Sequence, residues 1–272
     1  MDGVDDRPSG RTRVLRMRLR RQPLEVNMSW QWEMTDFGIV TYAVDPDRLA
    51  ALLPHSFEPD VFSLDSGVEC AFVSAVPFHV ASLTMGGVRI PLGFVQVNYR
   101  AYIRRHGERC VWFFGSSVST RTVLVPRAFY GLPWYFATSS LDAGWVEGAG
   151  SDYVLRTAGA WGDADFHCTG TGEAVERLDG FADLAETLDV LTAPRSGFCI
   201  RGDGSLLELR VRHDLLAPQT AVASAAAFSV FEDLNLTSRE TPLHSVLLQK
   251  ATTFDVLPPR VAKRPPRIVP PA

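Results

Sequence analysis

The stretch Phe94-Val95-Gln96-Val97-Asn98-Tyr99-Arg100-Ala101-Tyr102-Ile103-Arg104 is the clearest regular pattern in this chain of 272 residues. Neighbouring side chains of a β-strand point to opposite faces of the sheet. One face of this strand is therefore apolar, and the other carries Gln96, Asn98, Arg100 and Tyr102. Two interpretations follow: the polar row faces water, which the pattern alone favours, or it lines a closed barrel and orients a ligand.

Segments with the same period of two recur along the chain, bounded by Gly, Pro or Asp. They span 37–44, 68–80, 109–118, 152–160, 164–169, 205–213, 222–231 and 243–256. We predict helices over 45–53, with Asp45 as its cap, over about 119–130 and over about 181–191. Gly170-Thr171-Gly172 and Gly202-Asp203-Gly204 are interpreted as turns. Because helices do not alternate with strands, the fold class is predicted as mainly β (β-rich α+β), with a mostly antiparallel sheet that closes on itself.

Charge is unevenly distributed over the chain. Residues 1–27 carry a net charge of +3 and residues 258–272 carry +4 with six prolines, so that residues 28–257 carry −11 within the total of −4. We interpret 1–27 as a basic, disordered N-terminal extension, 28–257 as one folded domain and 258–272 as a Pro-rich basic tail. A body of this charge repels phosphates, so no nucleic-acid partner is expected.

Several other classes of protein are not indicated. No run of 18 apolar residues and no apolar signal-peptide core is present, which predicts a cytoplasmic protein without a membrane partner. The four cysteines form no C-x-x-C pair, and neither a metal site nor a cofactor is expected. His79 and His213 lie at the ends of the predicted strands 68–80 and 205–213 and could act as general bases, although a histidine at a strand end is more often structural.

A set of segments comes in an order that points to a known family. They are 37–54, Phe72-Val73-Ser74-Ala75-Val76-Pro77-Phe78, Val97-Asn98-Tyr99-Arg100-Ala101-Tyr102, Val111-Trp112-Phe113-Phe114, 127–135, Arg212-His213 and 254–259. This order resembles the DUF2071 family of the acetoacetate decarboxylase-like superfamily, over roughly residues 36 to 262. The resemblance implies a closed, cone-shaped antiparallel β-barrel with a few helices packed outside and a ligand pocket within.

The resemblance also implies a test for decarboxylation. In the decarboxylases of this superfamily, a lysine just after a Gly-aromatic-Pro turn forms a Schiff base with the keto substrate, and a glutamate on the preceding polar strand assists proton transfer. Here the turn is Gly131-Leu132-Pro133, followed by Trp134 and Tyr135, and the acid position is Gln96. The two lysines of the chain are Lys250 and Lys263. We therefore expect no Schiff-base chemistry.

The remaining groups predict a non-covalent role. We predict Arg100, Tyr102 and Tyr135 as catalytic, since Arg100 can hold a carboxylate or enolate and a tyrosine can carry a proton. Predicted substrate-binding residues are Gln96, Asn98, Trp112, Phe114, Trp134, His79 and His213. The first hypothesis is an isomerase, dehydratase or cyclase acting on a keto-acid-like or polyketide-like metabolite. The alternatives are a non-catalytic binding protein for a hydrophobic metabolite and, third, a decarboxylase using another residue; a homo-oligomer is left open.

Overall fold

The computed structural model describes residues 30–121, 127 and 130–261. The predicted N-terminal extension, most of the predicted helix 119–130 and most of the Pro-rich tail lie outside these residues, and the domain boundaries stay a prediction. The strands are β1 Trp30–Val44, β2 Glu58–Pro59, β3 Val61–Ser63, β4 Glu69–Met85, β5 Val88–Arg105, β6 Glu108–Val118, β7 Trp134–Phe136, β8 Thr138–Val146, β9 Ala149–Ala158, β10 Ala164–Ala174, β11 Ser196–Ile200, β12 Leu206–Arg212, β13 Gln219–Phe228, β14 Ser245–Val256 and β15 Arg260–Val261. The helices are α1 Pro46–Ala50, α3 Leu184–Thr192 and α4 Ser229–Asp233.

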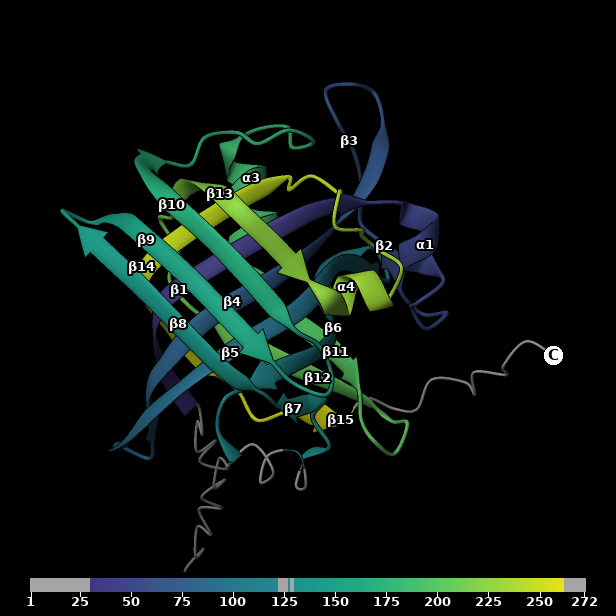
Figure 1. Ribbon diagram of the computed structural model, residues 1–272. Coiled ribbons are helices and arrows are strands. Elements are labelled where there is room, and N and C mark those ends of the chain that lie inside the picture. Colours follow the sequence, from purple (N-terminus) through teal and green to yellow (C-terminus); the bar gives the residue numbers. More distant parts are fainter. Residues whose placement is uncertain (1–29, 122–126, 128–129, 262–272) are drawn as a thin grey trace, which may run out of the picture.

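The strands form one extensive sheet with a closed part and an open part. Strands β12, β11, β6, β5, β4, β1 and β14 pair in this order, and a β12–β14 pairing closes them into a ring. From β14 the sheet continues through β13, β10, β9 and β8, which lie as a second layer across β1, β4 and β5 (Figure 1). Most pairings are antiparallel; β6 pairs in parallel with β11 and with β7. The predicted mainly β fold with a mostly antiparallel sheet is confirmed.

Strand β5 is buried on both faces, which explains the alternation in its sequence. Its apolar face, including Val97, Tyr99 and Ala101, packs into the core between the ring and the second layer. Leu155, Phe166 and Phe228 complete that core from the other side. The polar face of β5 therefore points into the ring, away from this core.

Local sequence determines the helix ends. Asp45 caps α1 as predicted, because its Oδ1 accepts a hydrogen bond of 2.8 Å from the Asp47 amide. Helix α3 begins at Leu184 rather than at Phe181, because Asp183 is its N-cap and accepts from the Glu186 amide. No helix in the described part of the chain is long and apolar enough to cross a bilayer.

Two predicted segments were wrong. Gly170-Thr171-Gly172 lies within β10 and is not a turn, because Gly170 lets β10 approach β9: a Cβ there would lie 2.7 Å from the Gly150 carbonyl oxygen. The predicted strand 222–231 ends at Phe228, where α4 begins. The turn at 202–204 is confirmed, since the Arg201 amide donates to the Ser205 carbonyl between β11 and β12. Strands β2, β3, β7, β8, β11 and β15 were not predicted.

Candidate functional site

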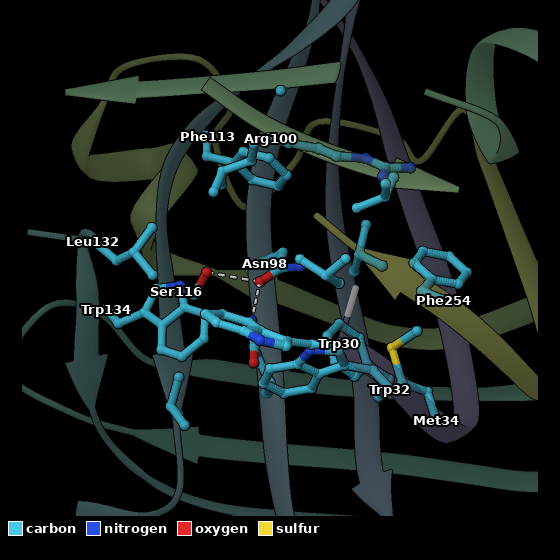
Figure 2. Close-up of a pocket in the computed structure, with 18 of the residues that line it drawn as sticks. Trp30, Trp32, Met34, Asn98, Arg100, Phe113, Ser116, Leu132, Trp134 and Phe254 are labelled. Atoms are coloured by element: carbon cyan, nitrogen blue, oxygen red, sulfur yellow. Dashed lines mark hydrogen bonds between the residues drawn. The ribbon is translucent and has the colours of Figure 1, made fainter. Parts of the chain in front are cut away.

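The ring encloses a cavity of about 520 Å³, a size common for small-molecule sites. Its lining comes mostly from ring strands, with further residues from the segment 130–134 that leads into β7 and from the end of α3, and it is mostly aromatic and aliphatic. Figure 2 shows Trp30, Trp32, Met34, Phe113, Trp134 and Phe254 around Asn98 and Arg100. The ring thus holds a few polar groups inside an apolar wall.

Among the described residues that line the cavity, Arg100 is the only one with a charged side chain. It is 7% exposed, and its Nη2 donates to the Leu191 carbonyl oxygen at 2.7 Å and to the Tyr102 hydroxyl oxygen at 3.1 Å. Leu191 lies in the last turn of α3, where the helix dipole favours a cation. No carboxylate of the described residues pairs with Arg100, and its Nε is buried without a partner there. A buried cation with only neutral partners favours an anionic ligand.

Asn98 organises the polar groups next to Arg100. Its Oδ1 accepts hydrogen bonds from Gln96 Nε2 at 2.6 Å and from Ser116 Oγ at 2.7 Å (Figure 2). With the oxygen doubly engaged, the Asn98 amide nitrogen remains available as a donor. The Asn98 side chain is thus held by an amide of β5 and a hydroxyl of β6, and neither a carboxylate nor an amine takes part in these hydrogen bonds.

Tryptophans form the wall at the start of β1. Trp32 contacts Trp134 edge-on at a ring separation of 6.5 Å, and Trp30 contacts Tyr130 at 5.9 Å. The indole nitrogens of Trp30 and Trp32 are buried without a hydrogen-bond partner among the described residues. Together with Arg100 Nε, the unpartnered groups around the pocket are N–H donors, which suits an acceptor-rich ligand.

Four of the predicted site residues line this cavity: Gln96, Asn98, Arg100 and Trp134. Tyr102 lies beyond Arg100 and lines a second cavity of about 310 Å³ with Asp60 and Arg109. Its hydroxyl lies 3.0 Å from the Ser74 hydroxyl and serves to hold Arg100. Tyr102 thus lies outside the lining of the first cavity and contacts it only through Arg100.

Three predicted aromatic residues lie outside the lining. Tyr135 follows Trp134 in strand β7, so it points to the opposite side, where it stacks on Trp161 at 4.7 Å. Trp112 points away from the ring interior and packs on Phe57 at 5.3 Å. Phe114 is the extra residue of a register shift between β5 and β6, and it packs against the core between the two layers.

The two predicted histidines and Lys250 also lie outside the lining. His79 Nδ1 lies 3.1 Å from Asp36 Oδ2. His213 stacks on Phe254 at a ring separation of 4.2 Å. Lys250 is exposed on β14. No lysine of the described residues therefore lines the cavity.

Sequence reasoning missed the residues that come from distant strands. Trp30 and Trp32 alternate with Gln31, which is a strand signal, and Tyr130 and Cys199 had no pattern that linked them to the site. Burial raises the pKa of the Cys199 thiol to about 12, so it is not a nucleophile at neutral pH. Within the described residues, His, Cys, Asp and Glu side chains form no group of three that could hold a metal ion.

Comparison with solved structures gives the fold neighbours. An acetoacetate decarboxylase from Legionella pneumophila is 15% identical with a TM-score of 0.56, over 87% of this chain and 88% of that one. The enduracididine biosynthesis enzyme MppR, complexed with pyruvate, is 12% identical with a TM-score of 0.57, over 89% and 93% of the two chains. An acetoacetate decarboxylase-like enzyme from Sphingomonas wittichii is 13% identical with a TM-score of 0.53, over 85% and 91%.

Because the sequence identity to these structures is 15% or lower, the comparisons show a shared fold and do not show a shared activity. No curated protein matches the sequence significantly. The model of the DUF2071 family, described as an uncharacterized conserved protein, matches residues 30–252, which include the ring strands except for the last four residues of β14. The predicted resemblance is confirmed: this chain belongs to the DUF2071 family and has the acetoacetate decarboxylase-like fold.

Proposed function

We propose that this protein binds a small, largely apolar metabolite through a carboxylate or enolate held by Arg100. The observation that carries the proposal is the burial of this guanidinium at a roomy apolar cavity without a carboxylate partner among the described residues. A guanidinium presents a planar fork of donors that matches a carboxylate. The fold neighbour MppR has been solved with pyruvate, a keto acid, which supports the same class of ligand here.

Arg100 should determine whether the ligand's charge is recognised. We expect phenylpyruvate to bind and phenylacetone, which lacks the carboxylate, to bind much more weakly. Arg100→Met keeps an apolar stem but removes the charge-assisted hydrogen bonds, which should weaken phenylpyruvate binding about 10- to 100-fold. Isothermal titration calorimetry measures both ligands on both proteins.

Arg89→Met is the matched control for this experiment. Arg89 lies on the same strand, but it is exposed and pairs with Glu33 outside the cavity. This variant should bind both ligands as the unmodified protein does. Equal affinity of phenylpyruvate for the Arg100→Met variant and for the unmodified protein would overturn the proposal.

A non-covalent enzyme of isomerase, dehydratase or cyclase type, acting on a keto-acid-like or polyketide-like metabolite, is the second candidate. It is favoured by the hydroxyl of Tyr130, which lines the cavity and could carry a proton. It ranks second because the described lining holds no Asp, Glu, His or Lys to act as the usual acid or base. Turnover of a bound carboxylate that is lost in Tyr130→Phe, with binding retained, would raise this candidate to first.

A further inference from the structure

The cavity is polar at one end and apolar at the other. Arg100 lies at the deep end, where the Leu191 carbonyl of α3 accepts from it. Leu92 lies eight positions earlier on β5, and at about 3.3 Å per residue this separates the two by roughly 26 Å along the strand. Leu92 lines the same cavity as Arg100. The lining therefore extends far beyond the reach of a three- or four-carbon keto acid.

The apolar end is where the cavity opens. Trp30 pairs with Met85 on one side and with Val256 on the other, and all three line the cavity. Met85 is 46% exposed, whereas Arg100 is 7% exposed. The next pair inward, Trp32 with Leu83, is apolar as well. A ligand tail that lies here meets indole and aliphatic side chains up to the solvent.

We infer that the ligand is an amphipathic carboxylate that binds head first, with its carboxylate at Arg100 and an apolar tail of several methylenes or a ring system directed to the opening at Trp30 and Met85. This inference rests on the proposed function and adds the class of ligand and its direction. The volume of about 520 Å³ and the apolar wall fit such a molecule, whereas pyruvate would leave most of the wall uncovered.

Straight-chain carboxylates from butanoate to hexadecanoate test the direction and the length of the tail by calorimetry. Affinity should rise about three- to fourfold with each added methylene that becomes buried. It should level off once the tail reaches the opening. In Arg100→Met the whole series should weaken by a similar factor, because the head is common to all members.

Leu92→Trp fills the path of the tail near the opening. This variant should lose most of the gain in affinity for tetradecanoate and hexadecanoate, whose tails are long enough to approach Leu92, with butanoate affinity changed less than about twofold. Val88→Trp is the control, since Val88 lies on the same strand and is 65% exposed outside the lining. It should bind every member as the unmodified protein does.

The outcomes separate the two proposals. If short carboxylates bind in an Arg100-dependent way but longer tails add nothing, or if both tryptophan variants act alike, the amphipathic ligand is overturned and the proposed function stands. If no carboxylate binds, or if Arg100→Met leaves the whole series unchanged, both fall.

Discussion

Asp60 lies almost fully buried between Arg104 of β5 and Arg109 of β6. Its carboxylate accepts from Arg104 Nε at 2.6 Å and from Arg109 Nε at 2.9 Å, with 3% of the side chain exposed. Removing this buried carboxylate leaves Arg104 without its ion-pair partner and leaves Arg109 with Glu186 alone. We expect Asp60→Ala to lower the free energy of unfolding by about 3 kcal/mol, measured by urea denaturation.

The control for this prediction is the exposed pair of Asp65 and Arg177. Asp65 is 62% exposed, so Asp65→Ala should cost less than about 1 kcal/mol. If the two substitutions cost the same, Asp60 does not act as a buried bridge.

The absence of a lysine from the described cavity lining gives a second prediction at the residue scale. Borohydride with pyruvate or acetoacetate traps a Schiff base as a stable secondary amine. We expect the intact mass to stay unchanged, because Lys250 is exposed on β14 and outside the lining. A stable adduct on Lys250 would contradict this and would revive the decarboxylase hypothesis.

How far single residues could be predicted depended on strand alternation. The period of two along 94–104 was enough to put Gln96, Asn98 and Arg100 on one face, and the structure places that face at the cavity. The alternation could not separate Tyr102 from them, because the same face continues past the end of the cavity. It also could not show which of Trp134 and Tyr135 faces the cavity, because a strand of three residues is too short to display an alternating pattern.

At the element scale, Asp36 of β1 links three strands, because its carboxylate contacts His79 of β4 and Trp145 of β8. Asp36 has a φ of 54° and lies at a register shift between β1 and β4. Its carboxylate accepts from Trp145 Nε1 at 2.7 Å and lies 3.1 Å from His79 Nδ1. Burial raises the pKa of Asp36, but hydrogen bonds from His79, Trp145 and Thr35 outweigh it, so the pKa lies below 3.8.

This lowered pKa predicts how stability depends on pH. A carboxyl group with a lowered pKa in the folded state stabilises the protein above its unfolded value of 3.8 and loses this contribution as the pH falls through the folded value. We expect Asp36→Asn to be about 2 kcal/mol less stable at pH 7, with the difference shrinking below about pH 4. Urea denaturation at several pH values measures both.

Asp142→Asn on β8 serves as its control, because Asp142 is exposed at the surface. It should follow the pH dependence of the unmodified protein. A constant difference between Asp36→Asn and the unmodified protein from pH 7 to pH 3 would show that the charge of Asp36 contributes nothing.

The predictability of elements follows the strength of local signals. Long alternating segments such as 68–80 and 109–118 were found, because each spans many residues of one period. Strand β8 was missed, because Thr138-Ser139-Ser140 and the glycine at 144 weaken the apolar signal of an edge strand. The helix at α3 was placed too early, because the buried Phe181 shares its apolar stripe although Asp183 begins the helix.

At the scale of the whole molecule, the ring closes through a short seam. Strands β12 and β14 are matched at Val211 with Val256 and at Arg212 with Asp255. Strands β4 and β5, in contrast, are matched over most of their length, from Val73 to Met85. Short pairings open with less free energy than long ones do.

We therefore expect amide hydrogen exchange to be fast at the seam and slow in the long strands. Peptides covering 209–213 and 254–258 should exchange before those covering 72–79 and 95–102. A bound carboxylate should slow amide exchange at the seam, since Val211 and Val256 both line the cavity. Equal protection of seam and long strands would show that the ring opens as one unit.

The ring as a whole was the hardest feature to predict. Its closure joins residues near 211 to residues near 256, and the β6–β11 contact joins 111–112 to 197–198. No local period encodes which distant strands meet. The family resemblance supplied that information, because it carries the order of the strands along with the segments that match.

Strand β5 has one further consequence, which concerns how such a protein can change over time. Its odd-numbered residues, such as Val97 and Tyr99, serve the core, and its even-numbered residues, such as Asn98 and Arg100, serve the cavity. Substitutions on the even positions can therefore alter ligand preference while the packing layer stays intact. One strand thus gives evolution separate access to specificity and to stability, so that new ligands can be explored without rebuilding the scaffold.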